Sequence, residues 1–510
     1  MMRGGKRDKK LRHWKKKKCK RKKQTPSNQK KSKPVEQDVE EDFNLLQRSL
    51  DTLDYPRLLK ALQAECSTAP ARSLVQRAQY DTVQSTANRK KQNKEPSLLA
   101  DTAADAQARY RAVQEMDWIL QGGHGKVNLQ GLTFRNGRGF KQDVAGRPPP
   151  LGGHSFDWED SLRTKLNQGL VLEGDDLMQI RLYLEAMQNI LAWGKALQTF
   201  DELEFIELPA LVQGIQVNET LQELLQAAFD KDQTEGFRLS GTTFPPVGRL
   251  RARVKDLRSS ILDTLDGLLA LPSMRSKLAL ESGGAVYSEV SGGRLVIPVE
   301  PKEASRIGIV HDTSRSGKTV YVEPTEIVGP TNELRQVEAE LRAEEARVWR
   351  QLTQQIVVNQ DILRRSIQAV GQLDLVTARL RLGQALEGTV PLVQEEGVVD
   401  LRNAKHPILL LRGISNVVGS DVQLGADGNQ GLVLTGPNSG GKTIILKLLG
   451  LVALMARAGI PVPAASGTDD YKPRVDFFNP ILSDIGDIQS VGGDLSTFSG
   501  HMLVCREVLN

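Results

Sequence analysis

The pattern Gly-x-x-x-x-Gly-Lys-Thr at 436–443 constrains the fold of this chain more than any other feature. A loop of this kind joins a strand to a helix, and its backbone N–H groups point at the phosphates of a nucleotide. The Lys442 side chain is expected to reach the β and γ phosphates, and the Thr443 hydroxyl is expected to bind Mg²⁺. The predicted site comprises Gly436, Pro437, Asn438, Ser439, Gly440, Gly441, Lys442 and Thr443.

The residues on both sides of this motif indicate whether it is a true phosphate loop or an accidental match to the pattern. Leu432, Val433 and Leu434 form the short apolar run expected of a central parallel strand. The chain from 444 to 455 is apolar nearly all round, which is typical of a buried helix. A strand, a glycine-rich loop and a buried helix in this order predict nucleotide binding.

The amino-acid sequence of the loop and of its flanking segments resembles that of one known family. Thr-Gly-Pro-Asn-Ser-Gly-Gly-Lys-Thr at 435–443, followed by the apolar stretch 446–464 that ends in Pro-Ala, is similar to the ATPase core of the MutS family. Lys405-His406-Pro407, Asp484-Ile-Gly-Asp487 and the segment 495–502 resemble its second-type branch, which is linked to suppression of recombination and to ribosome rescue.

The resemblance implies ATP and Mg²⁺ as ligands and a homodimer as the working form. ATP would close the dimer, and Ser496 and Thr497 would contact the nucleotide of the partner subunit in trans. The target would be branched or mismatched DNA, with negative regulation of recombination, or a stalled ribosome reached through ribosomal RNA. Sequence leaves the choice between these two targets open.

A second acidic ATPase motif cannot be recognised, so no catalytic residue is assigned and ATP hydrolysis stays open. The run Phe477–Asp484 imitates an acidic strand, but Asn479 and Pro480 are expected to break it. In the family the acidic strand follows the segment 495–502. We therefore expect the chain to correspond to an N-terminal part, without the nuclease-like module of this branch. An ATPase sheet lacking later strands would leave an apolar edge and a conformationally loose C-terminal region.

The basic charge of the chain is concentrated at its beginning. Residues 1–34 contain 17 Lys or Arg and one Asp, whereas the whole chain has a formal charge of +6. The folded remainder is therefore acidic. Such a Lys-rich segment cannot bury enough surface to fold, which predicts a disordered arm over 1–42. The arm could bind phosphate backbones, act as a nuclear or organelle address, or be a solvated end.

Cysteines and hydropathy point to an intracellular soluble protein, cytoplasmic or in the nucleoid, with a plastid location left open. Cys19, Cys66 and Cys505 are isolated and show neither a zinc spacing nor a disulfide framework. No apolar run approaches a membrane span, so we expect no membrane partner.

The expected fold is multidomain: a mostly α-helical core and lever with a small β clamp insert, followed by an incomplete α/β P-loop ATPase domain. Helices are expected over 43–120 and 157–230, and a long loop over 122–153. The expected divisions are 1–42 (basic arm with an acidic hinge), 43–246 (helical core), 247–390 (lever, with a clamp insert at 283–328) and 391–510 (ATPase part).

The lever is predicted from two apolar seams with helical spacing. They comprise Leu250, Val254, Leu257, Ile261, Leu265 and Leu268, and then Leu334, Val337, Leu341, Val348, Leu352 and Ile356. Between the seams lie short β-like runs at 295–299, 308–310 and 320–322. Arg315 and Lys318 are candidate nucleic-acid contacts, or else a solvated turn. The neighbouring His311 and Asp312 are expected to serve structure rather than catalysis.

Two functions compete on this basis. The first is an ATP-dependent MutS-like clamp on nucleic acid. The second is a non-catalytic ATP-gated scaffold, or a fragment without independent activity. A small-molecule kinase is disfavoured because long seamed arms serve no such chemistry.

Overall fold

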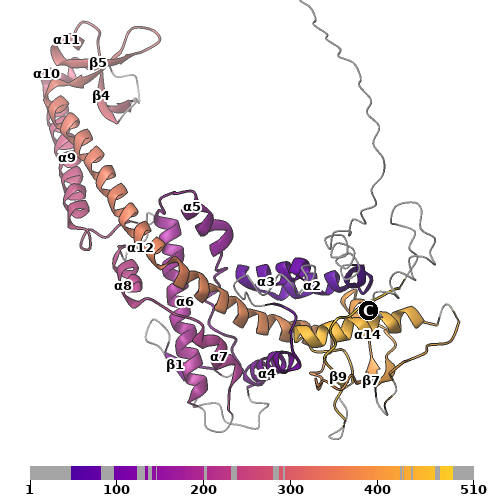
Figure 1. Cartoon of the computed structure of the whole chain (residues 1–510). Helices are drawn as coiled ribbons and strands as arrows, with labels where there is room; N and C mark the ends of the chain where they lie inside the picture. The colour runs from indigo at the N-terminus through magenta and orange to yellow at the C-terminus, as the bar shows by residue number, and fades with distance from the viewer. Residues whose placement is uncertain are drawn as a thin grey trace, which may run out of the picture.

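The described part of the molecule is elongated and mostly helical (Figure 1). A single helix, α12 (Thr325–Ala385), has 61 residues and is therefore roughly 90 Å long. It runs from a small sheet at one end of the molecule to the C-terminal region, where Gly383 lies against Pro461. The computed structural model describes residues 48–81, 97–122, 133–135, 141–144, 146–199, 204–230, 238–279, 286–290, 293–425, 428, 430–437, 440–465 and 471–485. The expected arm over 1–42 lies outside these residues.

Three N-terminal helices confirm the prediction of helices over 43–120: α2 (Tyr55–Glu65), α3 (Ala69–Asp81) and α4 (Ala103–Leu120). Helix α2 starts with Pro56 in its first turn, where the missing N–H costs no hydrogen bond. Thr102 caps α4 by accepting a hydrogen bond from the Asp105 N–H at 3.1 Å. Both α2 and α3 pack against the C-terminal part of α12.

The prediction of a long loop over 122–153 is wrong in one respect, because this range contains a two-stranded antiparallel sheet. Strand β1 (Thr133–Arg135) pairs with β2 (Lys141–Asp143), and Phe134 lies opposite Gln142. Each strand has three residues, too few to establish an alternating pattern in the sequence. Strand β1 packs against a helix, α6, that is distant in the sequence, and this tertiary surface explains the pairing.

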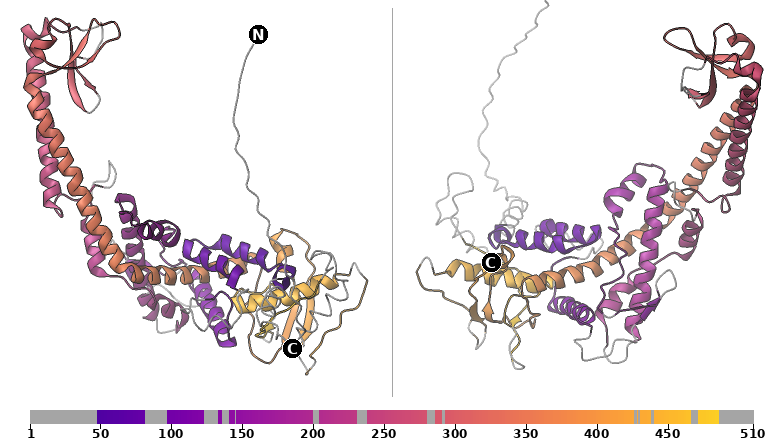
Figure 2. Two further views of the ribbon diagram at one scale, coloured as in Figure 1. Left: turned by 45° about the horizontal axis from the view of Figure 1, so that its top comes forward. Right: turned by 180° about the vertical axis from the view of Figure 1, so that it is seen from behind.

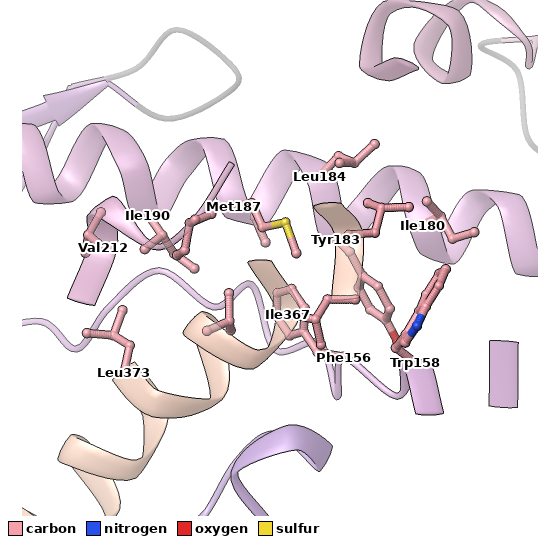
Figure 3. Close-up of a cluster of buried hydrophobic side chains, with 14 of the residues drawn as sticks. Phe156, Trp158, Ile180, Tyr183, Leu184, Met187, Ile190, Val212, Ile367 and Leu373 are labelled. Atoms are coloured by element: carbon pink, nitrogen blue, oxygen red, sulfur yellow. The ribbon is translucent and has the colours of Figure 1, made fainter. Parts of the chain in front are cut away.

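The prediction of helices over 157–230 is confirmed. The elements are η3, a π-helix (Trp158–Leu162), α5 (Arg163–Asn167), α6 (Gly174–Gln198), α7 (Glu207–Gln213) and α8 (Glu219–Ala227). Figure 3 shows Tyr183 and Met187 of α6 in one apolar cluster with Phe156 and Trp158 and with Ile367 of α12. The Phe156 and Tyr183 rings stack with centroids 4.7 Å apart. This cluster fixes the middle of α12 to the helical core.

The two seams form an antiparallel pair between α12 and α9 (Pro245–Ala270), which run side by side in both views of Figure 2. Leu257, Ile261 and Leu265 are buried at steps of four. The next buried residue is Leu269, one position beyond the predicted Leu268, because the step of four continues. On α12 the predicted seam is buried at Leu334, Val337, Val348, Leu352 and Ile356, and Leu341 is partly buried against the core.

A four-stranded antiparallel sheet caps the helix pair, and we call residues 288–324 the clamp. It follows α10 (Pro272–Arg275) and has the strand order β3-β4-β6-β5. The elements are β3 (Ser288–Val290), β4 (Arg294–Val299), α11 (Ala304–Ile307), β5 (Gly308–Thr313) and β6 (Val320–Pro324). The three predicted β runs at 295–299, 308–310 and 320–322 are therefore confirmed. Buried Ile297 and Val322 pack against the end of α9, so the clamp and the lever share one apolar cluster.

The C-terminal region contains a three-stranded antiparallel sheet of order β8-β7-β9 beside α14 (Lys442–Ala458). Its strands are β7 (Val399–Ala404), β8 (Ser420–Leu424) and β9 (Arg474–Val475), and α13 (Pro407–Leu411) follows β7. Residues 476–485 form no strand, which confirms that Phe477–Asp484 is not an acidic strand.

The predicted central strand at Leu432–Leu434 is wrong in this structure. Residues 430–435 have no regular secondary structure, and Val433 is 86% exposed. A strand needs a neighbour to pair with, and none of the described strands pairs with this segment. The observed fold is thus a mostly helical, multidomain one with small antiparallel sheets.

Candidate nucleotide site and clamp

The loop 436–443 turns directly into α14, as the sequence pattern predicts for a phosphate loop. Gly441 is the N-cap of α14 and has φ 78°, and Gly436 has φ 144°, both in the region that favours glycine. A Cβ atom at either position would meet nothing within 4 Å. The glycines thus serve backbone conformation, and the surface in front of the helix N-terminus stays open. The first N–H groups of a helix have no intrahelical acceptor and attract anions.

Lys442 folds back over the loop that precedes it. Its Nζ donates to the carbonyl oxygen of Pro437 at 2.8 Å and to that of Gly436. Both acceptors are neutral, so the ammonium charge is not compensated by these bonds. An amine held at the mouth of a glycine-rich loop fits the phosphates of a nucleotide, which would replace the two carbonyls as acceptors. Thr443 lies beside it and is exposed.

Helix α14 is exposed at its beginning and buried towards its end. Ile444 and Leu446 are 45% and 43% exposed, whereas every residue from Leu451 to Ala458 is buried. The prediction of a helix buried throughout is therefore wrong for its first turns, because no strand of the described chain covers them. Exposed apolar side chains of the loop region, Leu432, Val433, Ile444 and Leu446, leave this end of the molecule apolar.

The middle of α14 is fixed to α2 by an ion pair and by close packing. Lys447 Nζ lies 3.0 Å from Asp54 Oδ2. A Cβ on Gly450 would come within 2.5 Å of Leu53 Cδ2, so the absence of a side chain allows α14 to approach. Asp54 has φ 60°, an unusual conformation for a residue other than glycine. These contacts connect the phosphate-loop helix to α2, which in turn packs on α12. Sequence patterns gave no signal for them.

His406, part of the Lys-His-Pro sequence at 405–407, is buried near the same ion pair. Burial lowers the pKa of His406 below its usual value, and the charges of Lys447 and Arg412 lower it further while Asp54 raises it. Its Nδ1 has no hydrogen-bond partner in the described structure. The imidazole is therefore held neutral between α13, α2 and α14.

Arg315 and Lys318 occupy the turn between β5 and β6, at the opposite end of α12 from the phosphate loop (Figure 1). The turn is closed by Ser314 N–H donating to the Thr319 carbonyl at 2.9 Å and by Thr319 N–H donating to Ser314 Oγ at 3.1 Å. Gly317 supplies a positive φ of 67°. Both cations are exposed on this hairpin, and the structure does not bring them near Lys442, which lies in α14 at the other end of the molecule (Figure 1).

A buried carboxylate organises the clamp, and the sequence analysis missed it. Glu323 of β6 is fully buried and accepts two hydrogen bonds from Arg294 Nη1, at 2.9 and 2.7 Å. His311 Nε2 lies 2.7 Å from the same carboxylate. Arg294 also donates to Asn332 of α12 at 2.6 Å. The prediction that His311 forms a structural hydrogen bond is confirmed, and this network joins β4, β5 and β6 to α12.

Several predicted site residues lie outside the described residues, namely Asn438, Ser439, Ser496 and Thr497. Asp487 also lies outside them, and Asp484 is described. Within the described residues, no group of three His, Cys, Asp or Glu side chains is arranged to hold a metal ion. In the same part of the chain, no helix has the length and apolar character needed to cross a bilayer.

Comparison with known proteins places these features in a family. The chain is 35% identical over 361 residues to the Endonuclease MutS2 of Streptococcus equi subsp. zooepidemicus. It is 33% identical over 356 residues to that of Pelotomaculum thermopropionicum, and 30% identical over 464 residues to that of Lacticaseibacillus paracasei. These matches cover 71%, 69% and 89% of the chain. No protein-family model matches it.

Identities of 30–35% over 69–89% of the chain show that it belongs to the MutS family. Within it, the relatives above are of the MutS2 type, as the resemblance of the motifs implied. The chain spans about half of the length of these curated relatives or somewhat less, at 43%, 42% and 50%.

Proposed function

We propose that this protein is an ATP-binding clamp on double-stranded nucleic acid that works as a homodimer. The observation that carries this proposal is that the glycine-rich loop and the basic hairpin lie at opposite ends of the molecule, the hairpin beyond the start of α12 and the loop at the start of α14 (Figure 1). Helix α12, together with α14 and the α2 region on which both pack, links a site suited to phosphate binding with a surface suited to a nucleic-acid backbone. Membership in the MutS family supports both assignments.

In this proposal the loop 436–443 holds ATP. Backbone N–H groups of the loop and the first turn of α14 bind its phosphates, Lys442 binds the β and γ phosphates, and the Thr443 hydroxyl binds Mg²⁺. Bound Mg²⁺ would neutralise phosphate charge there. Ser496 and Thr497 contact the nucleotide of the partner subunit, so ATP closes the dimer. The domain divisions 1–42, 43–246, 247–390 with 283–328 inserted, and 391–510 belong to the same proposal.

The nucleic-acid assignment rests on the charge pairing within the clamp. Arg294 is bonded to Glu323, and Lys302 lies 2.7 Å from Glu300. Arg306 lies 4.0 Å from Glu303. Arg315 and Lys318, in contrast, are exposed on the hairpin turn, and no ion pair of the described structure includes them. Phosphates of a duplex backbone are the matching partners.

A binding experiment separates the parts of this proposal. Mg-ATP binding and ATP-dependent dimerisation are measured on the protein and on Lys442→Ala. Binding of a branched DNA duplex and of a ribosomal RNA stem-loop is measured over a salt series, with Arg315→Gln and Lys318→Gln combined. Arg342→Gln, on the exposed face of α12, is the matched control. The proposal predicts loss of ATP binding in Lys442→Ala and a weaker salt dependence in the clamp double variant.

The same experiment distinguishes branched DNA from ribosomal RNA as the target, and both from an ATP-gated scaffold that binds no nucleic acid through the clamp. Tighter binding of branched DNA favours a role in limiting recombination, and tighter binding of the RNA stem-loop favours a ribosomal target. Unchanged nucleic-acid affinity in the clamp double variant would contradict the clamp proposal. It would favour an ATP-gated scaffold, for which the exposed apolar residues Ile309 and Val310 on the edge strand β5 offer a protein-binding surface.

A further inference from the structure

The helix that follows the glycine-rich loop, α14, is loosely held at its start. Thr443 and Ile444 are exposed, and Leu448 is the first residue of the helix that is buried. In the described part of the chain, Lys442 donates to carbonyl oxygens of its own loop and to no other group. The direction in which the start of α14 points is therefore set by contacts further along the helix.

Two contacts fix α14 to the start of α2. The first is the ion pair in which Lys447 Nζ lies 3.0 Å from Asp54 Oδ2. The second is the close approach of Gly450 to Leu53, where an added Cβ would come within 2.5 Å of Leu53 Cδ2. Leu53 is 1% exposed and belongs to the same buried cluster as Leu448, so it cannot easily give way. Charge pairing and packing thus hold α14 at two positions three residues apart.

Thr443 lies on the same face of α14 as these two contacts. Positions 443, 447 and 450 are separated by four and three residues, a spacing that places them in one row along an α-helix. Thr443 lies about one turn from Lys447, or roughly 6 Å along the helix axis. Contacts at 447 and 450 fix the rotation of α14 about its axis. That rotation decides where the side chain of Thr443 points.

Asp54 holds its place against the usual preferences of its backbone and side chain. It is the N-cap residue of α2, with φ 60° and ψ 21°, a left-handed conformation that residues other than glycine rarely adopt. An aspartate at an N-cap commonly accepts a bond from the N–H groups of its helix, but Asp54 makes no such bond. Its two oxygens instead pair with Arg57 Nη1 at 2.8 Å and with Lys447 Nζ at 3.0 Å. Strain of this kind persists where the surrounding contacts impose it, and it is concentrated near functional sites.

We propose that Asp54 is a positioning residue of the nucleotide site, which acts through Lys447 to set the rotation of α14 and so directs the Thr443 hydroxyl at the metal ion of Mg-ATP. This role rests on the proposed function, which supplies the ligand. Loss of the pair should weaken the contribution of Mg²⁺ to ATP binding more than the binding of the phosphates. The reason is that Lys442 and the loop N–H groups are held by the loop itself.

The test is the ATP affinity of the full chain, measured by titration calorimetry once with Mg²⁺ and once with EDTA. Lys447→Gln should weaken the binding of Mg-ATP roughly tenfold and should change the binding of metal-free ATP less. Asp54→Asn should have the same effect, because asparagine tolerates the left-handed conformation and removes only the charge. Lys447→Arg keeps the cation and should keep the affinity of the unchanged protein.

Two further variants separate positioning from a general loss of stability. Lys165→Gln removes a partly exposed ion pair of the helical core, in which Lys165 Nζ lies 2.6 Å from Asp176 Oδ1, and should leave ATP binding unchanged. Gly450→Ala adds a Cβ against Leu53 without altering any charge. It should weaken Mg-ATP binding in the same way as Lys447→Gln, because it also changes how α14 lies on α2.

The outcomes distinguish this role from the proposed function. Equal affinity for Mg-ATP in Lys447→Gln and Lys165→Gln would overturn the role of Asp54, while loss of binding in Lys442→Ala would leave the nucleotide site standing. An equal loss with Mg²⁺ and with EDTA would also overturn it, because it indicates a general loosening of α14. If the unchanged protein bound no Mg-ATP, the proposed function would fail, and the positioning role would fail with it.

Discussion

Glu323 shows how one side chain can decide the structure of a whole module. It is fully buried, and its carboxylate is shared by Arg294 and His311 on two neighbouring strands. The sequence around it, Val-Tyr-Val-Glu-Pro at 320–324, reads as the end of a strand and gives no sign of a buried charge. A buried charge needs partners of opposite charge, and here they come from the neighbouring strands. They can be identified only when the pairing of the strands is known.

Replacing Glu323 by Gln should destabilise the clamp. The change removes the buried charge and leaves the partly exposed Arg294 and His311 without their anion, a loss of about 1 to 3 kcal/mol. Hydrogen exchange of β4–β6 measures the effect, and Glu289→Gln on the exposed side of β3 is the control. Equal protection of the clamp strands in both variants would contradict the role assigned to Glu323.

His406 should make stability dependent on pH. Its pKa in the folded protein is lowered by burial, so the unfolded chain takes up a proton first as pH falls. Stability from this residue is present above the unfolded pKa of about 6.5 and is lost as pH drops below it. Urea unfolding at several pH values should show this decline, and His406→Gln should reduce its slope. A slope that is identical in the variant would mean that other groups cause the decline.

At the scale of elements, the pairing of α9 and α12 depends on its apolar seam rather than on its ion pairs. Leu265 is fully buried between these helices and the clamp, whereas Arg258 and Glu338 form a pair at 2.7 Å that is open to solvent. Exposed pairs contribute about 0 to 1 kcal/mol. The burial of a leucine contributes more, because its truncation also leaves a cavity.

Leu265→Ala should therefore cost about 3 kcal/mol, and Arg258→Gln should cost less than about 1 kcal/mol. Denaturant unfolding, monitored by a fluorophore attached to the clamp, measures both. A larger effect for Arg258→Gln than for Leu265→Ala would show that the lever depends on charge pairs after all.

At the scale of the whole molecule, α12 passes through three apolar clusters. Leu334 and Val337 belong to the cluster of the clamp, Ile356 and Leu373 to that of the helical core, and Leu382 to the one around α14. The clamp cluster involves α9, α12 and the sheet. We therefore expect it to open as a separate cooperative unit, without exposing the other two clusters.

The exposed phosphate-loop region should be the first site of proteolysis, and Mg-ATP should protect it. Residues 430–435 have no regular structure, and Val433 is 86% exposed. Limited chymotrypsin digestion, followed by mass spectrometry, should give an early cut near Leu432–Leu434. ATP should slow that cut in the protein but not in Lys442→Ala. A compact, resistant fragment covering 400–510 without ATP would contradict the expected loose C-terminal region.

The sequence by itself determined the elements whose signal is local. The two seams, the β runs of the clamp and the loop before α14 follow from side-chain spacing and from the conformational freedom of Gly436 and Gly441. These features depend on residues within a few turns of one another.

The tertiary structure decided everything that needs a distant partner. It paired β1 with β2 against α6, left Leu432–Leu434 without a neighbouring strand, and exposed the first turns of α14. It also brought Glu323 to Arg294, Lys447 to Asp54, and Arg109 to the backbone carbonyl of Arg457. Strand pairing and charge burial depend on residues that are distant in the sequence and adjacent in the fold. A pattern of neighbouring residues in the sequence does not identify those distant partners.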